Sequence, residues 1–255
     1  MKYKVLTKRN LLTLLIFFSL GLLVAITSIN SVSKAIKTAT TNKIVPIYFV
    51  DKKEKMCSIS FDAAWGNEQT DTLLNILDQY NIKTTFFLVG EWVDKYPESV
   101  KKIAEKGHDV ENHSSTHAYM TQLSNEEIKQ DLTECNNKIK KITGKAPTLF
   151  RPPYGDYNNN VVKTVMDMNM YCIQWNIDSL DWQDPSVDRI VQNCVNKLVE
   201  GSIILLHNGA TNTPQALPKI IEAIHSKGYK IVPISQILLK GEYKTDVQGK
   251  MCKVQ

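Results

Sequence analysis

Apolar and polar positions from residue 44 onward alternate in patterns that predict strands and helices in turn. Short apolar runs bounded by turn residues are typical of buried strands, whereas apolar spacings of three and four residues are typical of helices. The predicted strands are 44–50, 56–61, 84–89, 108–111, 148–150, 171–175, 202–206 and 230–232. The predicted helices are 68–80, 96–106, 124–142, 160–168, 188–199, 214–227 and 234–239.

This alternation predicts a parallel sheet covered by helices. Six or seven strand–helix units in a chain of this length favour a small, incomplete (β/α) barrel over an open sheet. The clearest helix start is the capping box of Ser124 and Glu127, which predicts where the long helix after residue 123 begins. We expect the domain to cover residues 44–240 and residues 241–255 to form a loose C-terminal tail.

A long apolar run precedes this domain. Residues 11–29 are interrupted only by threonine, serine and one glycine, and they follow the basic residues Lys2, Lys4, Lys8 and Arg9. A helix of that length spans roughly 30 Å, the hydrocarbon thickness of a bilayer. We therefore expect residues 1–10 to be cytoplasmic, 11–29 to be an uncleaved transmembrane anchor and 30–43 to be a linker. A cleaved signal peptide is the alternative, and either arrangement places the domain outside the cytoplasm.

Composition and charge narrow the functional classes. Hydrophobic residues at 43% and charged residues at 22% exclude a disordered chain. The formal net charge is +5, but seven basic residues and no acidic residue precede Asp51, so the domain itself is slightly acidic. We therefore expect no nucleic-acid partner.

The five cysteines form no CxxC pair and predict no metal cluster. Export makes disulfides possible, but Cys57 and Cys172 lie in predicted strands and are better explained as small buried side chains.

Polar side chains follow several predicted strands, where parallel barrels carry their functional groups. These candidates are Asp62, His113, His117, Arg151, Asp178 and His207. Taken singly, each has a structural explanation, such as a helix cap or a hydrogen-bonded histidine. The spacing of His113 and His117 predicts two imidazoles on one face of a helical turn, an arrangement that can chelate zinc.

Five segments occur in an order that identifies a family. They are S-F-D-A-A-W-G at 60–66, H-S-S-T-H at 113–117, R-P-P-Y-G at 151–155, D-S-L-D-W at 178–182 and L-L-H at 205–207. Residues 45–240 therefore resemble the polysaccharide deacetylases of carbohydrate esterase family 4, which contain the NodB homology domain. The resemblance implies an incomplete (β/α) barrel of about seven strands.

The family resemblance also implies a reaction, the hydrolysis of the N-acetyl group of an amino sugar with release of acetate. A divalent metal, with zinc expected, polarises the amide carbonyl and activates water in such sites. By resemblance, His113 and His117 are metal ligands. Asp62 is the general base, Arg151 pairs with it, and the backbone N–H of Tyr154 helps to stabilise the oxyanion.

The remaining roles implied by the resemblance concern the leaving group and the acetyl pocket. His207 is expected to be the general acid that protonates the leaving amine, with Asp178 raising its pKa. Trp182 and Leu205 are expected to wall the acetyl methyl group, although plain core packing would explain them equally well.

One position departs from the family pattern. The second aspartate of the first motif is the family's third metal ligand, and Ala63 occupies that position. Asp62 could become the ligand, Glu68 could fill the gap, or the domain could bind no metal. Three hypotheses follow: a metal-dependent N-deacetylase, a degenerate deacetylase that binds glycan, or an O-acetyl esterase.

The altered first motif and the expected anchor resemble the sporulation-type deacetylases of spore-forming bacteria. This resemblance predicts peptidoglycan or a related cell-wall polysaccharide as the partner, and leaves the particular amino sugar open.

Overall fold

The computed structural model describes residues 18–29 and 43–254 of the chain. Residues 18–29 are helical, and among the described residues no helix is both long and apolar enough to cross a bilayer. The expected cytoplasmic segment, residues 11–17 of the expected anchor and residues 30–42 of the expected linker lie outside the described residues. The chain divides after Lys43 into two units, and the fold described below is that of the unit beginning at Ile44.

Seven parallel strands form the curled sheet at the centre of this unit. Their spatial order is β6 (Tyr171–Cys172), β5 (Leu149–Phe150), β4 (Asp109–Asn112), β3 (Thr85–Leu88), β2 (Met56–Ala63), β8 (Ser202–His207) and β7 (Ile177–Asp178). The short strand β9 (Lys230–Ile231) pairs in parallel with the start of β2. The arrangement confirms the predicted incomplete (β/α) barrel.

The segment before β2 links the two ends of this parallel sheet. The predicted strand 44–50 is reduced to β1 (Phe49–Val50), which pairs antiparallel with β8 at Ser202. Ile47 bridges to the other end of the sheet, because its N–H donates to the carbonyl of Cys172 at 2.9 Å and its carbonyl accepts from Gln174 at 2.7 Å. The barrel is therefore closed here by isolated backbone bonds rather than by a full strand.

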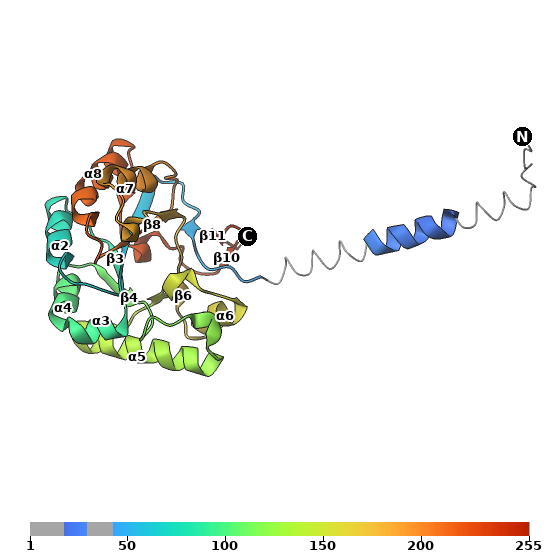
Figure 1. The fold of residues 1–255 in the computed structure, drawn as a ribbon, viewed down its shortest axis with the longest axis horizontal. Coiled ribbons are helices and arrows are strands. Elements are labelled where there is room, and N and C mark those ends of the chain that lie inside the picture. Colours follow the sequence, from blue (N-terminus) through green and yellow to red (C-terminus); the bar gives the residue numbers. More distant parts are fainter. Residues whose placement is uncertain (1–17, 30–42, 255) are drawn as a thin grey trace, which may run out of the picture. The chain divides into compact units, whose positions relative to one another are not determined.

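Helices cover the outside of the curled sheet (Figure 1). They are α2 (Thr70–Gln79), α3 (Gly90–Lys95), α4 (Pro97–Glu105), α5 (Asn125–Thr143), α6 (Asn159–Asp167), α7 (Val187–Val195), α8 (Thr213–Ser226) and α9 (Ile234–Ile237). The predicted helix 96–106 corresponds to α4, which Pro97 opens at the first helical position, where no backbone N–H is needed. The capping box of Ser124 and Glu127 starts α5 as predicted.

Strand β2 separates a polar row from an apolar row, because successive side chains of a strand point to opposite faces. In the polar row, Ser58 donates to the carbonyl of Val232, directly after β9, and Ser60 donates to the carbonyl of Ile204 on β8. Asp62 continues that row into the site. The apolar row packs against the helices and consists of Cys57, Ile59, Phe61 and Ala63. The alternation therefore separates Asp62 from Ala63.

The C-terminal residues form structure that the sequence analysis missed. Instead of a loose tail, residues 241–255 include the antiparallel hairpin of β10 (Tyr243–Thr245) and β11 (Lys250–Lys253). Strand β11 pairs in parallel with β1, and Met251 is fully buried in the core beneath it. Burial of this side chain and pairing with an exposed strand edge hold the segment in place.

All five cysteines are free thiols. Cys57, Cys135, Cys172 and Cys194 are buried, as expected for Cys57 and Cys172.

Candidate active site

A cavity of 390 Å³ opens at the carboxyl ends of the parallel strands and collects most of the predicted site residues. Its walls include Asp62, His113, His117, Tyr154, Asp178, Trp182, Leu205 and His207. Arg151 is fully buried beside Asp62 and does not line the cavity. Side chains spread over the sequence therefore meet where a parallel barrel places its functional groups.

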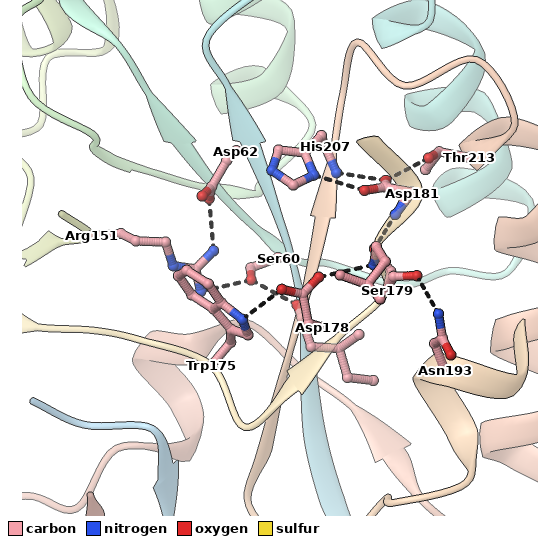
Figure 2. A network of polar contacts seen from close by, with 12 residues as sticks. Ser60, Asp62, Arg151, Trp175, Asp178, Ser179, Asp181, Asn193, His207 and Thr213 are labelled. Atoms are coloured by element: carbon pink, nitrogen blue, oxygen red, sulfur yellow. Dashed lines mark hydrogen bonds and ion pairs between the residues drawn. The ribbon is translucent and has the colours of Figure 1, made fainter. Parts of the chain in front are cut away.

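Asp62 and Arg151 form a buried ion pair at this end of the barrel (Figure 2). Arg151 Nη1 donates to Asp62 Oδ1 at 2.7 Å, and Nη2 donates to Ser60 Oγ at 2.9 Å. Burial acts to raise the pKa of Asp62, but the charges of Arg151 and the nearby histidines outweigh it and hold that pKa below its usual value. Asp62 is therefore ionised at neutral pH, and its second oxygen is left to act as a base.

The two histidines of the H-S-S-T-H segment approach each other from a loop, not from a helical turn as predicted. The segment follows the end of β4, and its backbone is left-handed at Ser114 (φ 73°) and His117 (φ 59°). Asp131 of α5 holds the loop, because its Oδ1 accepts from the Ser115 N–H at 2.9 Å. The imidazole ring centroids of His113 and His117 lie 5.1 Å apart. The predicted proximity is therefore confirmed, although the predicted helix is wrong.

A backbone hydrogen bond sets the orientation and tautomer of His113. Its Nδ1 lies 2.7 Å from the carbonyl oxygen of Arg151, which can only accept, so Nδ1 carries the proton. Its Nε2 faces Asp62 Oδ2 at 3.4 Å. Burial lowers the pKa of His113, so Nε2 keeps a free electron pair at neutral pH. A fixed tautomer of this kind is what a metal-ligating histidine requires.

The third metal ligand of the family has no counterpart at this site. Ala63 is fully buried in the apolar row of β2 and does not line the cavity. Glu68 is exposed and accepts a hydrogen bond from the Asn67 N–H at 2.9 Å, so it does not fill the gap. Over residues 18–29 and 43–254, no three histidine, cysteine or acidic side chains are placed to share an ion. The described residues do not fit a metal ion held by three protein ligands.

The imidazole of His207 is paired with Asp181, whereas Asp178 was the residue expected to raise its pKa. The imidazole Nδ1 donates to Asp181 Oδ1 at 2.7 Å, and Asp181 Oδ2 also accepts from Thr213 Oγ1 at 2.6 Å (Figure 2). Burial acts to lower the pKa of His207, but the hydrogen bond and charge of Asp181 outweigh it, and the pKa is raised. Asp178 adds a smaller contribution in the same direction.

The D-S-L-D segment explains why Asp181, and not Asp178, is the hydrogen-bond partner of His207. Asp178 accepts from the indole N–H of Trp175 at 3.2 Å and from the Leu180 N–H at 2.9 Å. Leu180 has a left-handed backbone (φ 57°), and this turn brings Asp181 beneath His207. The sequence shows two acidic residues in the motif, but only the turn decides which one reaches the imidazole.

Aromatic residues that the sequence analysis did not single out complete the site. Trp65 lines the cavity and packs on His207 with ring centroids 5.1 Å apart. Tyr119 stacks on Tyr154 with centroids 4.3 Å apart. Of the two predicted wall residues, Leu205 is 3% exposed, whereas Trp182 is 52% exposed and is therefore not a core residue. Trp65 could have been found because it follows Asp62 within the same motif.

Comparison with known proteins identifies relatives of this chain. The family model for polysaccharide deacetylase matches residues 49–173. Two peptidoglycan-N-acetylglucosamine deacetylases of Bacillus cereus are each 34% identical to this chain. The first alignment covers 74% of this chain and 91% of the relative, and the second covers 69% and 66%. The protein YlxY of Bacillus subtilis is 32% identical to this chain. The alignment covers 76% of this chain and 60% of the length of YlxY.

Solved structures share the fold. The wild-type BA3943 protein of Bacillus anthracis, described as a pseudoenzyme of carbohydrate esterase family 4, has a TM-score of 0.73 and 35% sequence identity. The match covers 75% of this chain and 68% of that one. A mutant of BA3943 is described as having restored enzymatic activity. The same fold therefore occurs in proteins described as deacetylases and in one described as a pseudoenzyme.

Proposed function

Because the chain belongs to the polysaccharide deacetylase family, we propose that it hydrolyses the N-acetyl group of an amino sugar in peptidoglycan or a related cell-wall polysaccharide. The observation that carries this proposal is that one cavity contains both a candidate base and a candidate acid. Asp62 is held ionised by Arg151, and Asp181 raises the pKa of His207, which favours its protonated form. A surface that only binds sugar has no physical need for a base and an acid with opposed pKa shifts.

The base half of the reaction uses Asp62. Its Oδ1 is held by Arg151 and its Oδ2 faces Nε2 of His113. In the proposed reaction, Asp62 accepts a proton from water as the water oxygen bonds to the acetyl carbonyl carbon. Negative charge then develops on the carbonyl oxygen, and the backbone N–H of Tyr154 is proposed to donate to it.

The acid half uses His207. Its Nδ1 proton is committed to Asp181, so a proton on Nε2 is the one available to the cavity. Donation of that proton to the sugar nitrogen accompanies cleavage of the amide C–N bond, and the products are acetate and a free amine. Trp182 and Leu205 line the same cavity and are proposed to contact the acetyl methyl group.

Acetate release by the full-length chain tests this proposal. The substrates are peptidoglycan, N-acetylglucosamine oligomers and an O-acetylated glycan, which separate amide from ester hydrolysis. His207→Gln is expected to lower kcat/KM on the N-acetyl substrate by about 10²–10⁴-fold. His225→Gln, which alters an exposed histidine outside the cavity, is expected to behave as wild type. Failure of the wild-type chain to release acetate from any N-acetyl substrate would overturn the proposal.

Ala63 favours a second candidate function, a deacetylase fold that binds glycan without efficient catalysis. In this reading, His113 and His117 retain at most weak affinity for a divalent metal, because the third ligand is missing. The buried position of Ala63 supports it, since a methyl group there contributes to the core and not to the cavity.

Ala63→Asp distinguishes the two candidates. A carboxylate placed in the apolar row of β2 is costly unless a cation compensates it. The variant is therefore expected to have a lower Tm than wild type in the presence of a chelator. Ala63 is the last residue of β2, so a rotation of the backbone at this strand end can turn the new carboxylate toward His113 and His117. Zinc is then expected to recover that Tm, and acetate release with it. Calorimetric melting with and without zinc measures the change in Tm, and an acetate assay measures the activity. Wild-type activity that is unchanged by chelator, combined with no zinc effect on the variant, would contradict a relaxed metal site.

Localisation forms a further part of the proposal. The substrate class and the basic, apolar N-terminal sequence support a domain that acts outside the cytoplasm. Resemblance of the F-D-A-A-W-G motif to sporulation-type enzymes supports a role in the cell wall of a spore-forming bacterium. Cell fractionation with protease accessibility of the domain tests its side of the membrane.

A further inference from the structure

The exposed aromatic side chains of residues 43–254 gather at one place. Four aromatic residues are exposed in this part of the chain: Trp65, Tyr119, Tyr154 and Trp182. Three of them line the cavity, and the fourth, Tyr119, stacks on Tyr154. The other large apolar side chains exposed here are aliphatic and do not line the cavity. Exposed rings confined to the rim of one cavity indicate a binding surface and not incidental surface composition.

Tyr119 and Tyr154 form a flat platform at this rim. Their ring centroids lie 4.3 Å apart with an interplanar angle of 16°, and they are 50% and 58% exposed. Tyr154 also packs against the His117 ring in a T-shaped arrangement, with centroids 4.5 Å apart. The tyrosine platform is therefore continuous with the catalytic side of the cavity.

The platform is held in place before any ligand binds. Tyr154 has a left-handed backbone (φ 59°), a conformation that costs a non-glycine residue about 1–2 kcal/mol. Asp156 ties the two loops together, because its carboxylate accepts from the backbone N–H of Thr121 at 2.8 Å and from its hydroxyl. Such fixed rings bind a ligand with little loss of side-chain entropy.

The chemistry of a flat, exposed ring pair selects the class of ligand. One face of a pyranose ring presents C–H groups, whereas its hydroxyl groups point outward around the rim. An aromatic platform can cover the C–H face while the hydroxyl groups keep their water. A closed apolar pocket would strip that water away, so the open position of the platform favours a sugar over an apolar ligand.

We propose that the tyrosine platform binds the sugar residue next along the glycan chain from the one whose acetyl group enters the cavity. The proposal rests on the proposed function, because it presumes that a glycan occupies the same site. It makes a chain of linked sugars, and not a single sugar, the preferred ligand.

Binding of N-acetylglucosamine oligomers to the full-length chain tests the platform. Titration calorimetry compares N-acetylglucosamine itself with the hexamer for wild type, Tyr119→Ala and Tyr119→Phe. Tyr119→Ala is expected to weaken hexamer binding roughly tenfold, equivalent to about 1.4 kcal/mol, and to leave binding of the single sugar nearly unchanged. Tyr119→Phe keeps the ring and is expected to bind as wild type. The control is Met166→Ala, which removes an equally exposed apolar side chain that does not line the cavity.

The outcomes separate the platform from the proposed reaction. Hexamer binding that depends on Tyr119 in a chain that releases no acetate would support the platform and overturn the N-deacetylase function. Acetate release with equal affinity of wild type and Tyr119→Ala for the hexamer would overturn the platform alone. Equal weakening of the single sugar and the hexamer would also overturn it, because a single sugar in the cavity does not reach the platform. Loss of binding in Tyr119→Phe would overturn it as well, because the aromatic ring would then not be the contact.

Discussion

Two buried carboxyl groups on nearby strands behave in opposite ways. Asp62 at the end of β2 is 4% exposed and Glu111 on β4 is 3% exposed. Asp62 receives the guanidinium of Arg151 at 2.7 Å, whereas Glu111 accepts from the backbone N–H groups of Thr148 and Leu149, both at 2.7 Å. The pKa of Asp62 is lowered, while burial raises the pKa of Glu111 to about 8.

The comparison shows that the cation, and not the depth of burial, decides which carboxyl can serve as a base. Both groups lose about the same exposure to water, and both accept close hydrogen bonds. Only Asp62 has a buried positive charge beside it, since the described residues form no ion pair with Glu111. Glu111 is therefore largely protonated at neutral pH and serves as a neutral link between β4 and β5.

Exchange of the two carboxyls for amides is expected to give the largest contrast. Asp62→Asn removes the proposed base while keeping the size of the side chain, so kcat/KM for acetate release is expected to fall by about 10²–10⁴-fold. Glu111→Gln is the matched control and is expected to retain wild-type kcat/KM, because Glu111 does not line the cavity. Parallel melting curves show whether both variants are folded.

A greater loss of activity in Glu111→Gln than in Asp62→Asn would contradict the roles given to the two carboxyl groups. If Asp62→Asn remained active while Glu111→Gln did not, the raised pKa of Glu111 would be the functional one. Similar activity losses without a change in Tm would mean that neither carboxyl acts alone.

The sequence predicts the site residues that lie in motifs at strand ends, but it does not predict Glu111. Asp62, Arg151 and His207 were predictable, because strand ends of a parallel barrel meet at one edge and the motifs mark those ends. The pairing of Arg151 with Asp62 followed from resemblance and is found in the structure. Glu111 was not predicted, because a glutamate inside a short strand gives no sign of whether its side chain is buried.

Backbone turns account for most of the remaining differences. His113 and His117 meet through left-handed residues that a helical spacing rule does not anticipate. Asp181, and not Asp178, hydrogen-bonds His207, because the left-handed backbone of Leu180 turns the chain between the two aspartates. The β10–β11 hairpin was missed because its short strands are mostly polar and because β1, with which β11 pairs, lies about two hundred residues earlier in the chain.

Stability measured against pH sharpens the contrast between the two carboxyls. The pKa of Glu111 is about 8 in the folded protein, whereas in the unfolded chain it has its usual value of 4.5. Its contribution to stability is therefore present in acid and lost as the pH rises from about 5 to 8. Glu111→Gln carries no charge at any pH and is expected to flatten this decline, which is on the order of a few kcal/mol.

Urea unfolding at pH 5.0 and pH 8.5 measures this difference for wild type and Glu111→Gln. The expected result is that the variant gains stability relative to wild type at the higher pH and gains little at the lower one. A difference that is the same at both pH values would mean that Glu111 does not titrate in this range, and the contrast with Asp62 would be lost.

A neighbouring charge also separates the pKa values of two imidazoles in the cavity, those of His117 and His207. The expected effect on activity is smaller than for the two carboxyl groups. Burial and the neighbouring His113 lower the pKa of His117 to about 4, whereas Asp181 raises the pKa of His207. A general acid acts in its protonated form, so the raised pKa of His207 keeps activity up to a higher pH. Asp181→Asn removes the charge and is expected to move the alkaline limb of the kcat/KM profile to lower pH by about one unit.

Asp178→Asn provides the comparison for that shift. Its carboxylate makes a smaller contribution to the pKa of His207 and hydrogen-bonds Trp175 and Leu180 instead, so the limb is expected to move less. If Asp178→Asn moved the limb more than Asp181→Asn, Asp178 and not Asp181 would be the main residue that raises the pKa of His207. An unmoved limb in both variants would mean that the alkaline decline belongs to another group, and the proposed role of His207 would fail with it.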